Sequence, residues 1–169
     1  YDPSQNMAQL FDAILKYIPA PQGDPDAPAQ VLISTIDYNE YVGRIGIGKV
    51  ERGTIKTGQE IVVCNYLDAD MRKKMRVNTL ATFDGLKRVP AQSVKFGDIV
   101  AISGIEGINI GDTICASDTP EPLPFVKITE PTVAMTFSVN DSPFAGKEGK
   151  YLTSRHLRAR LYRELQTDV

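Results

Sequence analysis

The sequence has few of the residues on which catalytic and metal sites usually depend. Its 169 residues include one histidine, two cysteines and no tryptophan. With a single histidine, His156, a histidine-based metal site is hard to assemble, and a Ser-His-Asp triad would depend on this one residue. Two lone thiols, Cys64 and Cys115, cannot form the disulfide framework of a small secreted domain, so we expect a reducing, cytoplasmic location and buried structural thiols. No apolar run approaches the roughly 18 residues of a membrane span, so we expect no membrane partner.

The composition that remains is that of a folded protein. The chain is 42% hydrophobic and 24% charged, with a net charge of -2. These values exclude a disordered acidic tail and a uniformly basic nucleic-acid-binding protein, and they allow the hydrophobic core of one domain. Because the chain begins at Tyr1 rather than at a methionine, we interpret it as an excised piece of a longer protein.

Residues 4–18 are expected to form one amphipathic helix, with Ser4 or Asn6 as its N-cap. The proline-rich residues 19–28 then stop the helix and form a linker, because proline cannot continue a helical ladder. The apolar stripe of the helix recurs at helical spacing and consists of Met7, Leu10, Phe11, Ile14, Leu15 and Ile18.

Residues 29–118 are rich in valine, isoleucine and threonine and are broken by glycine turns at short intervals. This pattern is typical of short antiparallel strands, and the absence of a helical period between them predicts a mainly β fold, a six-stranded antiparallel barrel. The candidate strands are residues 30–38, 42–52, 59–65, 72–83, 98–103 and 113–116.

A second proline-rich stretch, residues 119–131, is expected to be a linker. Alternating apolar residues then predict a strand at 132–139, and a leucine stripe predicts a helix over 153–166 with Thr153 or Ser154 as its cap. One strand and one helix make half of an α/β sandwich. The apolar face of the strand should therefore pack on the helix, on the barrel or on a second copy of the chain, and a dimer through its edge would be a consequence of truncation.

The segment Gly43–Val50 nearly matches the phosphate loop G-x-x-x-x-G-K-[ST]. Position 50 is valine, which has no hydroxyl for Mg²⁺, and the segment lies in β-favouring sequence rather than before a helix. We therefore interpret it as a glycine-bearing barrel strand. A nucleotide-binding enzyme that uses Gly43–Val50 is the alternative.

Charge is unevenly distributed along the chain. Residues 1–40 contain six acidic residues and one lysine, whereas residues 142–163 contain six lysines or arginines and one glutamate. A second group of cations lies within residues 72–76. Basic patches of this kind suit phosphate backbones, and they equally fit a solvated surface. The loop that precedes the last helix also carries Phe144, which offers a stacking surface for a base.

Two parts of the presumed barrel resemble the second-domain barrel of the translational GTPases, the group of elongation factors Tu and G. A closer resemblance, to the BipA/TypA ribosome-associated GTPases, covers essentially the whole chain. The superfamily motifs are Gly43–Ile61, Val94–Gly104 and Ile110–Ile114, and the closer match is carried by Leu10–Pro19, Ser34–Gly46 and Asn140-Asp-Ser-Pro-Phe-Ala-Gly-Lys-Glu-Gly-Lys-Tyr-Leu-Thr-Ser-Arg155.

The resemblance implies a division of the chain into four parts. Residues 1–28 would be the last helix of a GTP-binding domain plus a linker, residues 29–118 the barrel, residues 119–131 a linker and residues 132–169 the truncated start of a third, α/β domain. In the family, GTP and Mg²⁺ are bound by the GTP-binding domain. This piece is therefore expected to hold no cofactor and to be no enzyme, while the full-length parent hydrolyses GTP.

The resemblance also implies the ribosome as partner, with the barrel facing small-subunit RNA and the third domain near the subunit interface. We expect a non-catalytic docking piece that couples the GTP state to ribosome binding; the alternative is a stand-alone protein-interaction barrel without RNA binding. The RNA-facing candidates are Arg44, Arg72, Lys73, Lys74, Arg76, Lys147, Lys150 and Arg155.

Overall fold

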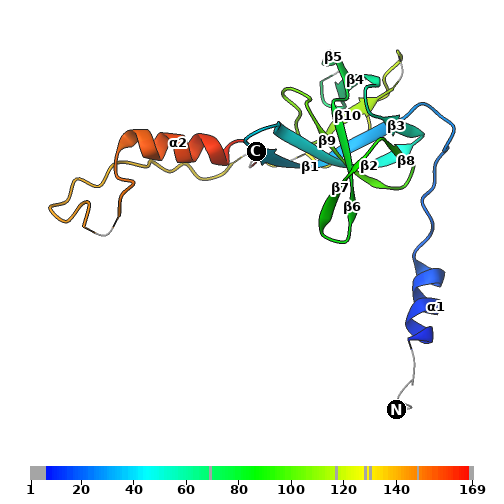
Figure 1. Cartoon of the computed structure of the whole chain (residues 1–169), viewed down its shortest axis with the longest axis horizontal. Coiled ribbons are helices and arrows are strands. Elements are labelled where there is room, and N and C mark those ends of the chain that lie inside the picture. The colour runs from blue at the N-terminus through cyan, green and yellow to red at the C-terminus, as the bar shows by residue number, and fades with distance from the viewer. Residues whose placement is uncertain are drawn as a thin grey trace.

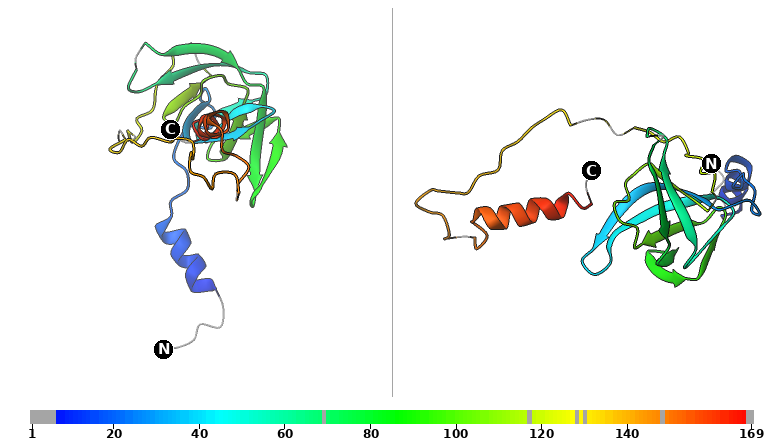
Figure 2. Two further views of the ribbon diagram at one scale, coloured as in Figure 1. Left: turned by 90° about the vertical axis from the view of Figure 1, so that its left-hand side faces the viewer. Right: turned by 90° about the horizontal axis from the view of Figure 1, so that it is seen from above.

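The chain forms a curled antiparallel sheet structure with a helix outside it toward each end of the chain, as Figures 1 and 2 show. The expected cap residues Ser4 and Asn6 lie outside the part of the chain that the structure describes. The computed structural model describes residues 7–68, 70–116, 118–127, 129, 131–147 and 149–167.

The central part of the chain consists of antiparallel strands in two sheets, which confirms the mainly β fold. Eight strands pair in the order β5-β4-β10-β1-β2-β9-β6-β7, and β3 pairs with β8. The strands are β1 (Gln30–Asn39), β2 (Gly43–Arg52), β3 (Thr54–Lys56), β4 (Glu60–Asn65), β5 (Arg72–Arg76), β6 (Thr79–Asp84), β7 (Lys87–Ala91), β8 (Ser93–Lys95), β9 (Ile99–Ser103) and β10 (Asp112–Cys115).

The strands enclose one apolar core. Side chains from both sheets contribute to it, including Val31 of β1, Val50 of β2, Ile55 of β3 and Val94 of β8, all of which are fully buried. Because burial of each such side chain contributes on the order of 2 kcal/mol, this shared core is the main stabilising interaction between the strands.

The pairing of β1 with β2 contains a bulge that depends on a glycine. The register shifts between Ile33 and Thr35, so that Ser34 is an extra residue in β1. Opposite the bulge, a Cβ on Gly48 would lie 2.1 Å from the carbonyl oxygen of Leu32. A residue with a side chain therefore does not fit at position 48, which gives the glycine a structural reason to be there.

Three features of the strand pattern differ from the sequence-based expectation. The short strands β3 and β8, which pair with each other, were not among the six expected strands. The expected strand 72–83 is divided into β5 and β6, because Val77 between them bonds to the turn at Gly58 and Gln59 instead of to a neighbouring strand. The segment after the Asp84-Gly85 turn returns as β7, which contains Pro90 and lies at the edge of the sheet, where a missing N–H is tolerated.

The N-terminal helix α1 (Ala8–Tyr17) forms as its periodicity predicts, and none of its residues is buried. Its stripe remains on the surface, with Phe11 57% exposed. The proline-rich residues that follow lie partly against the barrel, where the Gly53 amide donates to the Asp24 carbonyl oxygen at 3.0 Å.

Residues 121–123 of the second proline-rich stretch also lie on the barrel. The side-chain amide of Gln30 donates to the Glu121 carbonyl oxygen at 2.6 Å, and Arg52 pairs with the Glu121 carboxylate at 2.8 Å. The Leu123 amide donates to the Thr113 hydroxyl at 2.9 Å. Residues 121–123 therefore cover the outer side of β10.

Residues 131–140 form no strand in the structure, although their apolar alternation predicts one. A strand needs a partner for its ladder, and these residues have none, so Val133 and Met135 are exposed. Phe137 and Val139 face the final helix α2 (Ser154–Glu164) across a cavity of about 460 Å³ that is also lined by Leu157, Leu161 and Leu165. The dimer through this edge stays a prediction.

We expect Gly48→Ala to destabilise the barrel, because its new Cβ would meet the Leu32 carbonyl oxygen, which no side-chain rotation can move. Overpacking costs roughly 1–3 kcal/mol or more, so the midpoint of urea unfolding should fall clearly. The matched control is Gly46→Ala in the same strand, whose Cβ would meet the flexible Cδ1 of Ile108 at 2.7 Å. Equal losses of stability in the two variants would contradict this account.

We expect Arg88→Met to raise the pKa of Asp37. The guanidinium of Arg88 in β7 donates a hydrogen bond to the Asp37 carboxylate in β1, and this bond holds the pKa of that carboxyl below its usual range. A carboxyl with a lowered pKa stabilises the fold above its unfolded pKa, and this stability is lost as the pH falls through the lowered value. NMR titration of the Asp37 carboxyl measures the change, with Lys87→Met as the control. An unshifted Asp37 in Arg88→Met would disprove the ion pair.

Candidate nucleic-acid interface

Three of the predicted RNA-facing cations form a row on one face of the edge strand β5. Successive strand residues point to opposite faces, so Arg72, Lys74 and Arg76 share one face. The register places Arg72 opposite Cys64, Lys74 opposite Val62 and Arg76 opposite Glu60 in β4. All three cations are exposed, so the strand presents a row of positive charges to solvent.

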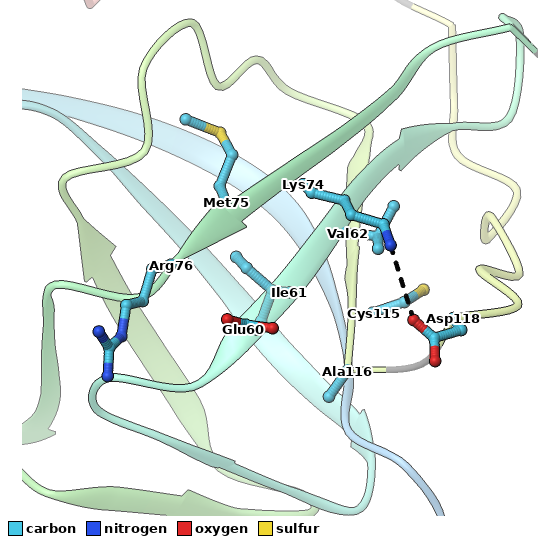
Figure 3. A pocket seen from close by; sticks show the side chains of 9 residues that line it. All are labelled: Glu60, Ile61, Val62, Lys74, Met75, Arg76, Cys115, Ala116 and Asp118. Atoms are coloured by element: carbon cyan, nitrogen blue, oxygen red, sulfur yellow. Dashed lines mark ion pairs between the residues drawn. The ribbon is translucent and has the colours of Figure 1, made fainter.

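The row lies beside a groove of about 470 Å³ whose lining includes Lys74, Arg76, Glu60 and Asp118. Figure 3 shows Lys74 directed toward Asp118, with Arg76 at the other end of the groove. The Lys74 ammonium lies 3.9 Å from the Asp118 carboxylate, and both groups are largely exposed, so the pair is weak. Arg76 donates through Nε to the Gly58 carbonyl oxygen at 2.6 Å, which fixes its position.

Lys73 belongs to the opposite face of β5. It is opposite Val63, whose side chain is buried in the core, and its neighbour Met75 packs against the same core. Lys73 itself is exposed. The four cations that are adjacent in sequence are therefore divided by the strand into a row of three and one residue on the other face.

Lys147, Lys150 and Arg155 form a second basic region, at the end of α2 that is remote from the barrel (Figures 1 and 2). All three are exposed. The Lys147 ammonium lies 4.8 Å from the centre of the Phe144 ring, a cation–π contact. The helix that carries Arg155 begins as predicted, with the Thr153 side chain accepting a hydrogen bond from the His156 amide.

Arg44 belongs to neither basic region. Its guanidinium donates to the Asn109 side chain at 2.9 Å and to the Leu165 carbonyl oxygen at 3.0 Å. Beside it, Arg163 of α2 lies 3.2 Å from Glu40 at the turn between β1 and β2. A cation on the last carbonyls of a helix also complements the helix dipole. The structure therefore gives Arg44 the position of a link between β2 and the C-terminal end of α2.

The near phosphate loop Gly43–Val50 is strand β2 from its first residue. The side chain of Val50 is buried, and the strand pairs with β1 along its length and with β9 over Ile45–Lys49. A phosphate loop needs backbone amides that converge before a helix, and here these amides belong to a sheet. The residues present do not fit GTP or its Mg²⁺ at this segment. Among the described residues there is also no group of three or more His, Cys, Asp and Glu that could hold a metal ion.

The two cysteines are buried on neighbouring strands, with their sulfur atoms 3.9 Å apart. Burial is the main cause that raises the pKa of the Cys64 thiol to about 12, and burial also raises the pKa of Cys115. Because the thiolate is the nucleophile, these pKa values are those of inert structural thiols, in agreement with the sequence-based prediction.

Sequence reasoning did not single out the hairpin of β6 and β7, which projects from the barrel in Figure 1. Its tip carries a fully exposed Leu86 and a partly exposed Phe83, with the Arg88 guanidinium 5.9 Å from the centre of the Phe83 ring. The available signal was the Asp84-Gly85 turn followed by apolar and basic residues. In the part of the chain that is described, neither helix is long and apolar enough to cross a membrane.

Comparison with known proteins gives a family match for the barrel and curated relatives for the chain as a whole. Residues 43–115 match the family model of elongation factor Tu domain 2. The chain is 50% identical over 171 residues to the large ribosomal subunit assembly factor BipA of Bacillus subtilis, covering 99% of this chain and 28% of that protein. It is 48% identical over 168 residues to the BipA of Synechocystis, with 99% and 28% covered.

The putative elongation factor TypA-like SVR3, chloroplastic, of Arabidopsis thaliana is 44% identical over 168 residues, with 99% of this chain and 25% of that protein covered. The chain thus spans little more than a quarter of the length of these relatives. Since the identity extends over almost all of its residues, from α1 through the barrel to α2, the chain belongs to the BipA/TypA family of translational GTPases.

Proposed function

We propose that this chain is a ribosome-docking part of a BipA/TypA translational GTPase and that it binds ribosomal RNA through two basic regions. The observation that carries the proposal is the row of Arg72, Lys74 and Arg76 on one exposed face of β5. Cations repeated every second residue along a strand can each neutralise one phosphate of an RNA backbone and release its counterions. The exposed Lys147, Lys150 and Arg155 supply the second contact.

The other parts of the chain have supporting roles in this proposal. Residues 29–118 act as one rigid unit, and residues 119–131 connect this unit to the α/β part that begins near residue 132. Arg44 holds the end of α2 against β2 rather than contacting RNA, because its guanidinium already donates to Asn109 and Leu165. The contact provides a route by which a change in the barrel position is passed to α2.

GTP binding and hydrolysis belong, in this proposal, to the whole protein and not to these 169 residues. The chain is a quarter of the length of its relatives, and Gly43–Val50 does not fit a nucleotide. Docking would therefore couple the nucleotide state of the whole protein to its place on the ribosome. The protein would act where ribosomes are, in the cytoplasm, although the Arabidopsis relative is named as chloroplastic.

We expect Lys74→Glu to weaken sedimentation of the chain with ribosomes several-fold at moderate salt and to reduce the salt slope of the affinity by about one, because one phosphate contact is lost. Lys73→Glu is the matched control, since it reverses the same charge on the neighbouring residue of the opposite face. Equal effects of the two variants would contradict the assignment of the binding face. Retention that does not depend on salt would favour a protein-interaction barrel instead.

We expect the double variant Lys147→Glu with Lys150→Glu to lose sedimentation with ribosomes, because repulsion replaces two phosphate contacts. Lys56→Glu with Lys95→Glu, on strands β3 and β8, changes the net charge equally and should bind like the unchanged chain. Repeating the sedimentation with purified small subunits and with purified large subunits identifies which subunit binds. The resemblance implies small-subunit RNA, whereas the bacterial relatives are named for large-subunit assembly. Unchanged sedimentation of the loop variant would remove this region from the interface.

A further inference from the structure

Hydrogen bonds within the loop between the extended segment and α2 shape its first part, residues 140–147. The Ser142 amide donates to the Asn140 side chain at 3.0 Å, the Ala145 amide to the Ser142 carbonyl oxygen at 2.9 Å and the Lys147 amide to the Phe144 carbonyl oxygen at 3.3 Å. Gly146 has a φ of 89°, a conformation that favours glycine. Consecutive turns thus run through residues 140–147.

This loop surrounds a cavity of about 310 Å³, at the small end of the range for ligand sites. A cavity of this size has room for one ring-shaped group and excludes a nucleic-acid duplex. Two of its walls are glycines, and a Cβ on Gly149 would meet no atom within 4 Å. The lining residues are Asn140, Phe144, Gly146, Lys147, Gly149 and Leu152.

Phe144 and Lys147 give the cavity its chemical character. The Phe144 ring is 71% exposed, so it contributes little to the packing of the chain. The Lys147 ammonium lies 4.8 Å from the centre of the ring. An exposed aromatic face with an adjacent cation is the combination by which proteins hold single-stranded RNA, since the ring stacks on a base and the cation neutralises its phosphate.

The charges near the cavity favour a ligand that carries phosphate. Lys150 follows in the loop and Arg155 lies in the first turn of α2, both exposed. By sequence, residues 140–155 carry Lys147, Lys150 and Arg155 against Asp141 and Glu148, which leaves a net charge of +1. A neutral ring would use the stacking surface alone, whereas a nucleotide uses both the ring and the cations.

We propose that this cavity binds one unpaired base of an RNA single strand, stacked on Phe144, with the adjacent phosphate at Lys147. The inference rests on the proposed function, because it assigns a base contact to one of the two basic regions described for docking. It adds a contribution that does not depend on salt to an interface that is otherwise electrostatic.

The test measures binding of the chain to a fluorescein-labelled ten-nucleotide RNA by anisotropy, with an abasic oligomer of the same length and charge beside it. Phe144→Leu removes the aromatic face while it keeps an apolar side chain, and the affinity for the RNA should fall about 5- to 100-fold. The affinity of this variant for the abasic oligomer, and the salt slope, should not change. Phe144→Tyr keeps the ring and should bind like the unchanged chain, as should Phe137→Leu, which lies outside the cavity.

The remaining outcomes separate this inference from the docking proposal. If Phe144→Leu binds RNA normally while reversal of Lys147 and Lys150 abolishes binding, the base site is wrong and electrostatic docking stands. If neither change alters RNA or ribosome binding, both are wrong for this region. If Phe144→Leu weakens sedimentation with ribosomes but not binding of the oligomer, the loop contacts protein and the base site is overturned.

Discussion

The close approach of β1 and β2 is the constraint on which the rest of the structure depends. At Gly48 the Leu32 carbonyl oxygen occupies the place where a Cβ would be, and the extra residue of the bulge lies beside it. Strand β2 is paired on its other side with β9, and β1 with β10, so this contact lies at the middle of the eight-stranded sheet. It also accounts for one glycine of the near phosphate loop: Gly48 allows a backbone to approach, and that backbone is the protein's own strand β1.

Local patterns in the sequence predicted those elements whose hydrogen bonds are local or whose neighbours are close in the chain. The apolar stripe of α1, the Thr153 cap of α2 and the β-rich centre all follow from short-range rules. The division of the expected strand 72–83 did not, because Val77 bonds to a turn almost 20 residues earlier in the chain. The strand expected at 132–139 did not form, because alternating apolar residues predict an apolar face but do not provide a neighbouring strand to pair with.

The candidate site shows the same limit. The charges of residues 72–76 were visible in the sequence, and the period of a strand is enough to place Arg72, Lys74 and Arg76 together once the strand is known. The position of Arg44 was not predictable, because one of its acceptors is the carbonyl oxygen of Leu165, 121 residues away. The sequence shows that Arg44 is a cation, but only the fold shows that its hydrogen-bond acceptors belong to distant residues, which makes it a structural contact.

The arrangement of two basic regions on one chain has an energetic consequence of its own. Each region offers about three exposed cations, and in the proposed docking each region alone would be a weak site at physiological salt. Linked sites bind with an effective concentration set by the segment between them. Here residues 121–123 are held on the barrel by Gln30, Arg52 and Thr113, which shortens the free part of that segment. Arg44 restricts the arrangement further by holding the C-terminal end of α2. These intramolecular contacts, which do not themselves bind RNA, would therefore set the effective concentration of one proposed RNA site relative to the other.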